Sequence, residues 1–490
     1  MRINLIYMFE NTFKNIDNLL WKDAGCSNAL DYVEQSSWIL FLKYLNDYEN
    51  ENRDAAELMG KQYTEIIPEE IKWRNWAAPK KTNGERDVIK ALTGEDLIDF
   101  INKTLFPTLK QFKKSAESFK TIQYKIGEIF GELNNKVTDG GILREVLWLV
   151  DGLKFQTSEE KHEMSYLYES RIQMMGNAGK NGGEYYTPRP LIRTIVEVVK
   201  PEIGNTVYDG ACGSAGFLCE AYKYLNEKVK SVEDMQTLQT DSFFGREKKG
   251  LAYIIGIMNM ILHGVEAPNI IHGNTLDIKL SDVQERDKYD IILANPPFGG
   301  KEKANVQQNF SIPSSETAYL FLEHFIKHLR AGGRAGVVIK NTFLSNSDNA
   351  SVALRKHLLE KCNLYAVLDL PGGTFTGAGV KTVVLFFKKG EPTQKVWFYQ
   401  LNLDRNLGKT NPLNEKDLEE FLALQPTQQE SENSWSINVS DLDPSTYDLS
   451  VKNPNKIEIT NHRTPKEIAQ EIETLNQSSH NLLTQILKTL

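Results

Sequence analysis

The chain has 490 residues, of which 40% are hydrophobic and 25% are charged. These proportions are typical of a folded globular protein and exclude disorder as the overall state. No run approaches 18 consecutive apolar residues, and the N-terminus lacks a long apolar core before a cleavage site. We therefore expect no membrane segment, no secretory signal and a cytoplasmic location.

Charge and cysteine usage narrow the function further. The net charge of −8 argues against a protein that holds nucleic acid mainly through phosphates, unless a local groove or a partner supplies basic groups. The four cysteines, Cys26, Cys212, Cys219 and Cys362, include no C-x-x-C pair. They are too few for a disulfide scaffold in a chain of this length, so we expect a reducing compartment and no metal site.

Residues 1–155 carry apolar residues at helical spacing and show no strand-like alternation. The clearest runs are Leu30–Leu45, Leu97–Leu105 and Leu143–Val150, and a polar loop at Pro79–Gly84 separates the first two. We predict an N-terminal all-helical domain whose apolar residues form a helix-bundle core.

From about residue 185, short apolar runs alternate with helical patterns, which is typical of a doubly wound parallel sheet. The strand-like runs are Thr206–Tyr208, Ser242–Phe244, Ile270–Ile271, Tyr289–Ala294, Gly336–Ile339, Tyr365–Leu368 and Thr382–Phe387. Helices fit between several of them, for example at Ala252–His263 and Ala318–Leu329. The last two or three runs follow one another closely and indicate an antiparallel edge. We predict an α/β fold with a Rossmann-like doubly wound sheet over residues 156–455.

Beyond about residue 400 the chain is polar, with a Gln/Glu/Ser-rich linker at Gln425–Ser434. Near the C-terminus apolar residues recur at nearly heptad spacing, with Ser479 and Thr489 at the remaining seam positions. The apolar positions are Ile468, Ile472, Leu475, Leu482 and Ile486. We expect a helical tail of two or three turns, rather than a long coiled coil, packed either against this chain or against a partner.

A glycine-rich turn follows the first predicted strand. Gly213 and Gly216 allow a ligand to approach the backbone closely, and Asp209 places an acid at the strand end. The segment has neither the G-x-G-x-x-G of a dinucleotide-binding loop nor the G-K-[ST] of a phosphate-binding loop. An acid that precedes a glycine loop instead suits a ligand with an amine and a ribose but no phosphate, such as S-adenosylmethionine.

Three further segments fit the same ligand or flank it. Glu247 ends the second predicted strand, where an acid commonly grips a ribose diol. After the third strand, an amide or acid would hydrogen-bond an adenine edge, and Asn274 and Asp277 remain alternatives for this role. Before the first strand, Gly183–Pro190 has the pattern of a helix start, with Thr187 as the cap and Pro188 at the first helical position.

The strongest signal is Asn295-Pro296-Pro297-Phe298, directly after the apolar run Tyr289–Ala294. The exocyclic amine of adenine is a poor nucleophile because its lone pair is delocalised into the ring. Two acceptors, the side-chain oxygen of Asn295 and the carbonyl of Pro296, would take its two hydrogens and free the lone pair for attack on a sulfonium methyl. The two prolines stiffen the loop, and Phe298 offers a face on which a flipped base stacks.

Taken in order, these segments resemble the amino-methyltransferases of DNA. More narrowly, nearly the whole chain is similar to the modification subunit of a type I restriction-modification system. The other segments that carry this resemblance are Trp21–Ala24, Phe41–Leu45, His263-Gly264, Leu370–Phe375, Tyr447–Ser450 and Lys452–Pro454. The resemblance implies transfer of a methyl group from S-adenosylmethionine to the exocyclic N6 amine of a flipped adenine in a specific DNA sequence.

The resemblance also assigns residues. It implies that Asn295, Pro296, Pro297 and Phe298 form the catalytic loop. The expected cofactor-binding residues are Glu184, Tyr185, Tyr186, Thr187, Pro188, Arg189, Asp209, Gly213, Ser214, Ala215, Gly216, Glu247, Asn274 and Thr275. The sequence departs from the family in two places: residues 209–216 read D-G-A-C-G-S-A-G where D-P-A-C-G-T-G-G is common, and Asn274 stands where many relatives carry Asp.

No segment of this chain has the size and charge of a domain that reads a DNA sequence. Roughly the last 90 residues follow the predicted strands, and residues 1–155 show no strong basic stripe. We therefore expect double-stranded DNA to be read by a separate specificity subunit, and the family arrangement implies a second copy of this chain and a restriction subunit. Residues 456–490 would contact the specificity subunit. The alternatives are a stand-alone RNA or protein-glutamine methyltransferase, a catalytically silent scaffold, and a nicotinamide-dependent oxidoreductase.

Overall fold

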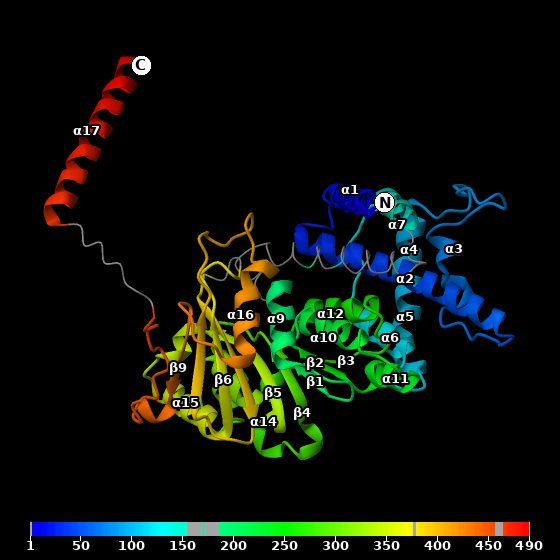
Figure 1. Cartoon of the computed structure of the whole chain (residues 1–490). Helices are drawn as coiled ribbons and strands as arrows, with labels where there is room; N and C mark the ends of the chain where they lie inside the picture. Colours follow the sequence, from blue (N-terminus) through cyan, green and yellow to red (C-terminus); the bar gives the residue numbers. More distant parts are fainter. Residues whose placement is uncertain are drawn as a thin grey trace.

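The computed structural model describes residues 2–153, 168, 172, 186–375, 379–455 and 464–489. The described part of the N-terminal region is helical, as predicted (Figure 1). Its α-helices are α1 (Arg2–Leu20), α2 (Ala29–Leu58), α3 (Trp73–Trp76), α4 (Gly94–Phe100), α5 (Phe106–Ser115), α6 (Ile122–Glu132) and α7 (Gly140–Asp151). Side chains fix three of the helix starts, since Asn28 accepts from the backbone of α2, Thr121 from that of α6 and Asp139 from that of α7.

The remainder is built on a nine-stranded sheet with the order β3-β2-β1-β4-β5-β7-β6-β8-β9. The strands are β1 (Val207–Asp209), β2 (Phe243–Glu247), β3 (Asn269–His272), β4 (Tyr289–Ala294), β5 (Leu329–Lys340), β6 (Cys362–Asp369), β7 (Thr382–Lys389), β8 (Lys395–Gln400) and β9 (Ser434–Asn438). Strands β1 to β6 and β8 run in one direction, whereas β7 and β9 are antiparallel to their neighbours.

The last predicted runs include an antiparallel strand, as expected, but this strand does not lie at the edge of the sheet. Strand β7 is antiparallel, but it lies inside the sheet between β5 and β6. The sheet continues beyond β6 because β8 supplies three buried aromatic residues, Trp397, Phe398 and Tyr399, and β9 closes the edge. The polar linker at Gln425–Ser434 therefore joins the helix α16 (Glu419–Leu424) to the last strand of the sheet.

Helices cover both faces of the sheet, which gives the doubly wound architecture predicted (Figure 1). Strand β4 shows the alternation, since Ile291 and Leu293 join one apolar cluster and Ile292 and Ala294 join the other. The first cluster includes α9 (Arg189–Val199), α10 (Gly216–Asn226) and α12 (Gly250–Leu262), and the second includes α14 (Thr317–His328) and α15 (Asn349–Lys361). The carboxyl ends of the parallel strands form the edge where such sheets bind ligands.

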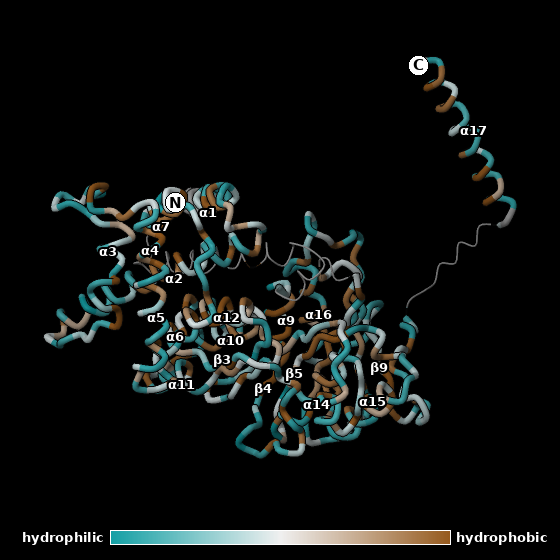
Figure 2. The backbone as a smooth tube through the Cα atoms, turned by 180° about the vertical axis from the view of Figure 1, so that it is seen from behind, coloured by the Kyte–Doolittle hydropathy of each residue, from teal (hydrophilic) through white to brown (hydrophobic). Residues whose placement is uncertain are grey.

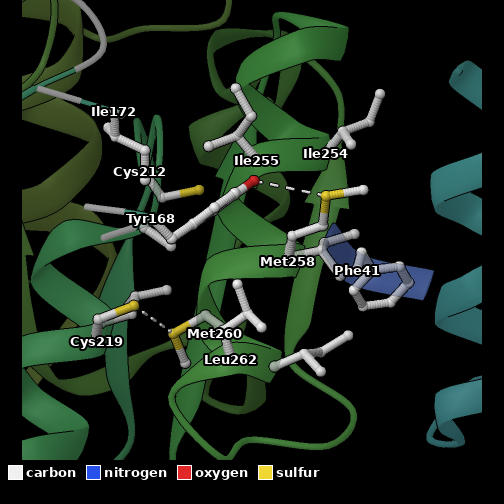
Figure 3. Close-up of a cluster of buried hydrophobic side chains, with 14 of the residues drawn as sticks. Phe41, Tyr168, Ile172, Cys212, Cys219, Ile254, Ile255, Met258, Met260 and Leu262 are labelled. Carbon is white, nitrogen blue, oxygen red and sulfur yellow. Dashed lines mark hydrogen bonds between the residues drawn. The ribbon is translucent and has the colours of Figure 1, made fainter. Parts of the chain in front are cut away.

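The helical region and the sheet share one continuous core. Phe41 of α2 lies in the same buried cluster as Ile254 and Met258 of α12 (Figure 3). The hydroxyl of Tyr44 donates to the backbone oxygen of Ile261 at 3.3 Å, and the hydroxyl of Tyr168 donates to Met258 Sδ at 3.5 Å. Residues far apart in the chain therefore hold α2 against the helix that follows Glu247.

The C-terminal helix α17 (Pro465–Thr489) has 25 residues, so the expected length of two or three turns is wrong. The helix continues past the polar seam residue Ser479 because many of its other residues are Glu, Gln and Lys, which have good helix propensity. Hydrophobic residues recur along it (Figure 2). The exposed fractions of its large apolar side chains range from 44% at Ile468 to 67% at Leu487. The described residues therefore do not show this helix packed against the rest of the chain, which was one of the two expected arrangements. No described helix combines the length and apolar character needed to cross a membrane.

Candidate active site

The candidate site lies at the carboxyl ends of β1, β2 and β4. These strands are parallel neighbours, so Asp209, Glu247 and Asn295 meet at one edge of the sheet. A narrow pocket forms there. Its lining residues are Tyr186, Thr187, Arg189, Ile192, Asp209, Ala211, Cys212, Gly213, Ser214, Gly216, Phe217 and Asn295. Three segments that the sequence analysis selected independently therefore surround one space.

The glycine loop is shaped by backbone conformations that few residues adopt. Gly213 has φ +51°, and its N–H donates to Oε2 of Glu247 at 2.9 Å. Ala215 also lies in the left-handed region, at φ +61°, where the family commonly has glycine. Ala215 therefore adopts this conformation at the cost of some backbone strain, and Glu247 holds the loop from the neighbouring strand.

The glycine at position 210 has a local structural reason. A Cβ there would lie 2.8 Å from the hydroxyl of Tyr208 and 3.0 Å from Phe325. A proline, which is common here in the family, brings a Cβ, and the buried Tyr208 leaves no room for it. The buried hydroxyl of Thr275 donates to the backbone oxygen of Gly210 at 2.5 Å, so Thr275 fixes the loop from beneath.

Asp209 is buried, and its Oδ1 accepts the N–H of Ala211 at 3.0 Å. Burial raises the pKa of this carboxyl to about 8, and the nearby charge of Glu247 acts in the same direction. The acid is therefore mostly protonated at neutral pH, and a cation bound beside it would favour its ionised form.

The pocket is narrow because Arg189 occupies part of it. A Cβ on Gly216 would lie 1.8 Å from Nη1 of Arg189, so this arginine requires a glycine opposite it. The guanidinium also lies 5.7 Å from the ring centroid of Tyr186. The water-accessible space is about 20 Å³, so the Arg189 side chain must move before a ligand of nucleoside size enters.

Thr187 does not cap the following helix, in contrast to the prediction. Helix α9 begins at Arg189, with Pro188 at the N-cap position in an extended conformation and no side-chain cap. The hydroxyl of Thr187 instead accepts a hydrogen bond from Nδ2 of Asn295 at 3.0 Å. Among the described residues, Oδ1 of Asn295 is buried and has no hydrogen-bond partner. A buried unpaired acceptor is costly, so this oxygen is available to accept a hydrogen bond from a ligand in the pocket.

Two aromatic rings meet at the end of the Asn295–Phe298 segment. Phe298 is half-buried, and its ring centroid lies 5.0 Å from that of Phe375 in an edge-to-face arrangement. Phe375 ends the segment Leu370–Phe375, which was selected only for its family resemblance. No spacing in the sequence links it to Phe298, because the pairing depends on β6 and β7 returning to the same edge as β4.

The other expected residues have varied positions. Glu184 and Tyr185 lie outside the described residues. Asn274 donates to Oδ1 of Asp277 at 3.0 Å and accepts the N–H of Leu276, so both alternatives for the adenine edge are bonded to each other and neither lines the pocket. Ser214 and Gly216 line the pocket, whereas Ala215 and the buried Pro296 do not.

The four cysteines are buried free thiols. Burial raises the pKa of Cys212 well above its usual value, so this thiol stays protonated within the loop. Within the described ranges, no group of three or more His, Cys, Asp or Glu side chains is arranged to hold a metal ion.

Comparison with known proteins places this geometry in a family. The family described as N-6 DNA Methylase matches residues 159–463, and the HsdM N-terminal domain matches residues 9–147. The chain is 34% identical to the type I restriction enzyme EcoEI methylase subunit of Escherichia coli, over 95% of this chain and 94% of that protein.

Two solved structures share the whole architecture. A modification subunit of a putative type I restriction enzyme from Vibrio vulnificus YJ016 superposes with a TM-score of 0.83 at 34% identity, over 93% of this chain and 99% of that one. A chain from a study of complex assembly and conformational transition of the type I R-M system gives a TM-score of 0.78 at 32% identity, over 98% and 97%. Neither these relatives nor the family matches support the RNA or protein-glutamine alternative.

Proposed function

We propose residue roles for this site from one premise: the chain belongs to the N-6 DNA methylase family, as the methylase subunit of a type I restriction-modification system, and is an adenine-specific DNA methyltransferase. The observation that carries the proposal is the buried, unpartnered Oδ1 of Asn295 among the described residues. It lies at the carboxyl end of β4 and beside the glycine loop, as an acceptor for the amine of a flipped adenine would have to.

The cofactor proposed is S-adenosylmethionine, which supplies an electrophilic methyl group on a sulfonium. The residues of the pocket fit it: a buried acid for a cationic group and a loop of left-handed residues for close approach. We assign Asp209, Gly213, Ser214, Ala215 and Gly216 to this loop contact. The other assigned cofactor residues are Glu184, Tyr185, Tyr186, Thr187, Pro188, Arg189, Glu247, Asn274 and Thr275.

In the proposed reaction, Oδ1 of Asn295 and the carbonyl of Pro296 each accept one hydrogen of the adenine N6 amine. With S-adenosylmethionine bound, the freed lone pair of N6 would take up the methyl group, a C–N bond would replace the C–S bond, and N6 would release one proton to water. Pro297 stiffens the loop, and Phe298 stacks on the flipped base, with Phe375 supporting the Phe298 ring.

Thr187 gives the Asn295 amide its direction. Because its hydroxyl accepts from Nδ2, the amide oxygen faces away from Thr187 and stays available to N6. We propose that Thr187 is a positioning residue, in addition to its place in the cofactor segment. This links cofactor-side geometry to the catalytic loop through one hydrogen bond.

The proposed partners are double-stranded DNA, a specificity subunit, a second copy of this chain and a restriction subunit. The exposed apolar seam of α17 supports an association role for residues 456–490. One similar structure comes from a study of assembly in the type I R-M system, which also supports this arrangement. We propose domain boundaries at 1–155, 156–455 and 456–490.

Co-expression with the neighbouring genes tests the partner claim. We expect a second protein to co-purify, and labelled methyl transfer from S-adenosylmethionine to DNA adenine to require it. Full, sequence-specific activity from the isolated chain would mean that this chain carries its own recognition element and would overturn the proposal.

A further inference from the structure

A second pocket lies on the same edge of the sheet, away from the candidate active site. It is formed at the carboxyl ends of β5, β6 and β8 and has a volume of about 590 Å³, within the range of small-ligand sites. We call it the β6–β8 pocket. Its lining residues are Asn341, Leu344, Asp369, Phe398, Gln400, Trp435, Leu449, Ser450, Val451, Lys452 and Asn453. One wall is the late segment, residues 447–453, to which the proposed mechanism assigns no role.

A buried arginine holds the late segment in place. Arg355 of α15 is fully buried, and its guanidinium donates to the backbone oxygens of Tyr447, Thr446, Phe343 and Asn346 at 2.7–2.9 Å. No salt bridge to Arg355 occurs among the described residues. Leu449 N–H also donates to the oxygen of Leu344 at 2.9 Å. The late segment is therefore pinned to the turn after β5, which leaves Ser450–Asn453 as the rim of the pocket.

The pocket combines aromatic walls with polar groups, three of which make no hydrogen bond or ion pair among the described residues. The rings of Phe398 and Trp435 stack at 5.5 Å, and Nε1 of the 5% exposed Trp435 has no hydrogen-bond partner among the described residues. The side chain of half-buried Gln400 makes no hydrogen bond within the described ranges, and exposed Lys452 makes no ion pair there. Asp369 accepts from Lys381 at 2.7 Å and from Asn341.

This combination of groups matches a nucleotide. Amide, carboxylate and indole N–H groups pair with the edge of a nucleobase, aromatic walls contact its plane, and a lysine at the rim suits a phosphate. The position also favours DNA. If Asn295 reaches an adenine at the end of β4, the DNA lies along this edge, and β8 is only four strands from β4, roughly 19 Å at about 4.8 Å per strand.

We propose that the β6–β8 pocket binds an unpaired nucleotide of the bound DNA other than the adenine that is methylated. This rests on the proposed function, because only a flipped adenine at Asn295 brings DNA to this edge. Two sources share the chemistry: the nucleotide left unpaired opposite the flipped adenine, and a nucleotide that flanks it on the same strand. Extrusion is easier for a base that has already lost its partner.

The test combines two substitutions in one pocket variant and compares it with a control variant, both in the complex with its co-purified partner. Gln400→Ala removes an amide that would pair with a base edge, and Lys452→Ala removes an ammonium that would bind a phosphate. Neither side chain makes a hydrogen bond or ion pair among the described residues, so we expect both substitutions to leave the fold intact. The matched controls are Gln394→Ala and Lys395→Ala, exposed residues at the opposite end of β8. We expect the combined pocket variant to raise the KM for DNA about tenfold, with the Kd for S-adenosylmethionine and the controls unchanged.

Duplexes with one abasic nucleotide distinguish the two sources. If the pocket holds the opposite nucleotide, an abasic residue opposite the target adenine removes most of the difference between the variant and the unaltered complex. If it holds a flanking nucleotide, the difference disappears only with an abasic residue at that position. A variant equal to the unaltered complex, or a difference that persists on every abasic duplex, would overturn the proposal. The unaltered complex must methylate the intact duplex for this comparison to be made. If it does not methylate that duplex, the result counts against the proposed function instead.

Discussion

Thr187 offers a sharp test of how the catalytic amide is oriented. Its hydroxyl accepts from Nδ2 of Asn295 at 3.0 Å, which leaves Oδ1 unpaired and directed toward the place assigned to N6. Thr187→Val keeps the shape of the side chain but removes the acceptor. The amide is then held in neither orientation, so a fraction of the molecules presents Nδ2, which cannot accept the hydrogens of N6.

The size of the effect follows from the bond that is lost. One neutral hydrogen bond contributes about 1 kcal/mol, which favours the correct amide orientation about fivefold over the flipped one, so its loss lowers the correctly oriented fraction by about twofold. Displacement of the loop by about 1 Å would increase the loss to about 100-fold. We expect the kcat for methyl transfer to fall by a factor between these limits while the Kd for S-adenosylmethionine is unchanged.

Thr187→Ser is the matched control because serine retains the acceptor. Single-turnover methyl transfer measures kcat, and calorimetry measures cofactor affinity, both on the complex. A valine variant with unchanged kcat would refute the orientation argument, as would a serine variant that loses as much activity as the valine variant. A loss confined to cofactor affinity would make Thr187 a cofactor ligand only.

Three further predictions follow from buried charge and exposed surface. Burial raises the pKa of Asp209 to about 8, and a bound cation lowers it, so cofactor affinity should rise by up to tenfold per pH unit between about pH 6 and 8 and level off above pH 8. Calorimetry measures this pH dependence of the affinity. Asp209→Asn should abolish the pH dependence. Arg355→Met leaves four carbonyl oxygens unsatisfied and should lower the free energy of unfolding in urea by about 3 kcal/mol or more, whereas Arg286→Met, at a 79% exposed side chain, should leave it unchanged. Deletion of residues 461–490 should leave the melting temperature unchanged and abolish co-purification of the partner; a stable complex without them would contradict the role of α17.

The parts of the fold that the sequence predicts are those with local signals. The run Tyr289–Ala294 is apolar and β-branched, so it predicts β4 and places Asn295 at a strand end, as observed. The glycine loop is predicted because Gly213 and Gly216 allow a ligand to approach the backbone closely, and the structure adds that Gly213 adopts φ +51°.

The parts that the sequence does not predict depend on contacts between distant residues. Strand β8 is short, and its buried Trp397 and Tyr399 are recognisable as core only once β6 lies beside them. The bond between Thr187 and Asn295 spans 108 positions, so local pattern assigned Thr187 to a helix cap instead. Seam residues such as Ser479 interrupt the apolar pattern but not the helix, so the pattern predicts a helix shorter than the 25 residues of α17.

The most direct test of the proposed active site is methyl transfer by the partner complex with Asn295→Ala. The complex is incubated with labelled S-adenosylmethionine and DNA, and the product is identified by mass spectrometry of the nucleosides. The unaltered complex should yield N6-methyladenine. Asn295→Ala should lower kcat by about 100-fold or more, the usual loss for a preorganised polar group in an active site, while the cofactor and the partner still bind. Transfer at an undiminished rate in the variant would contradict the assignment of the Asn295–Phe298 loop as the catalytic element.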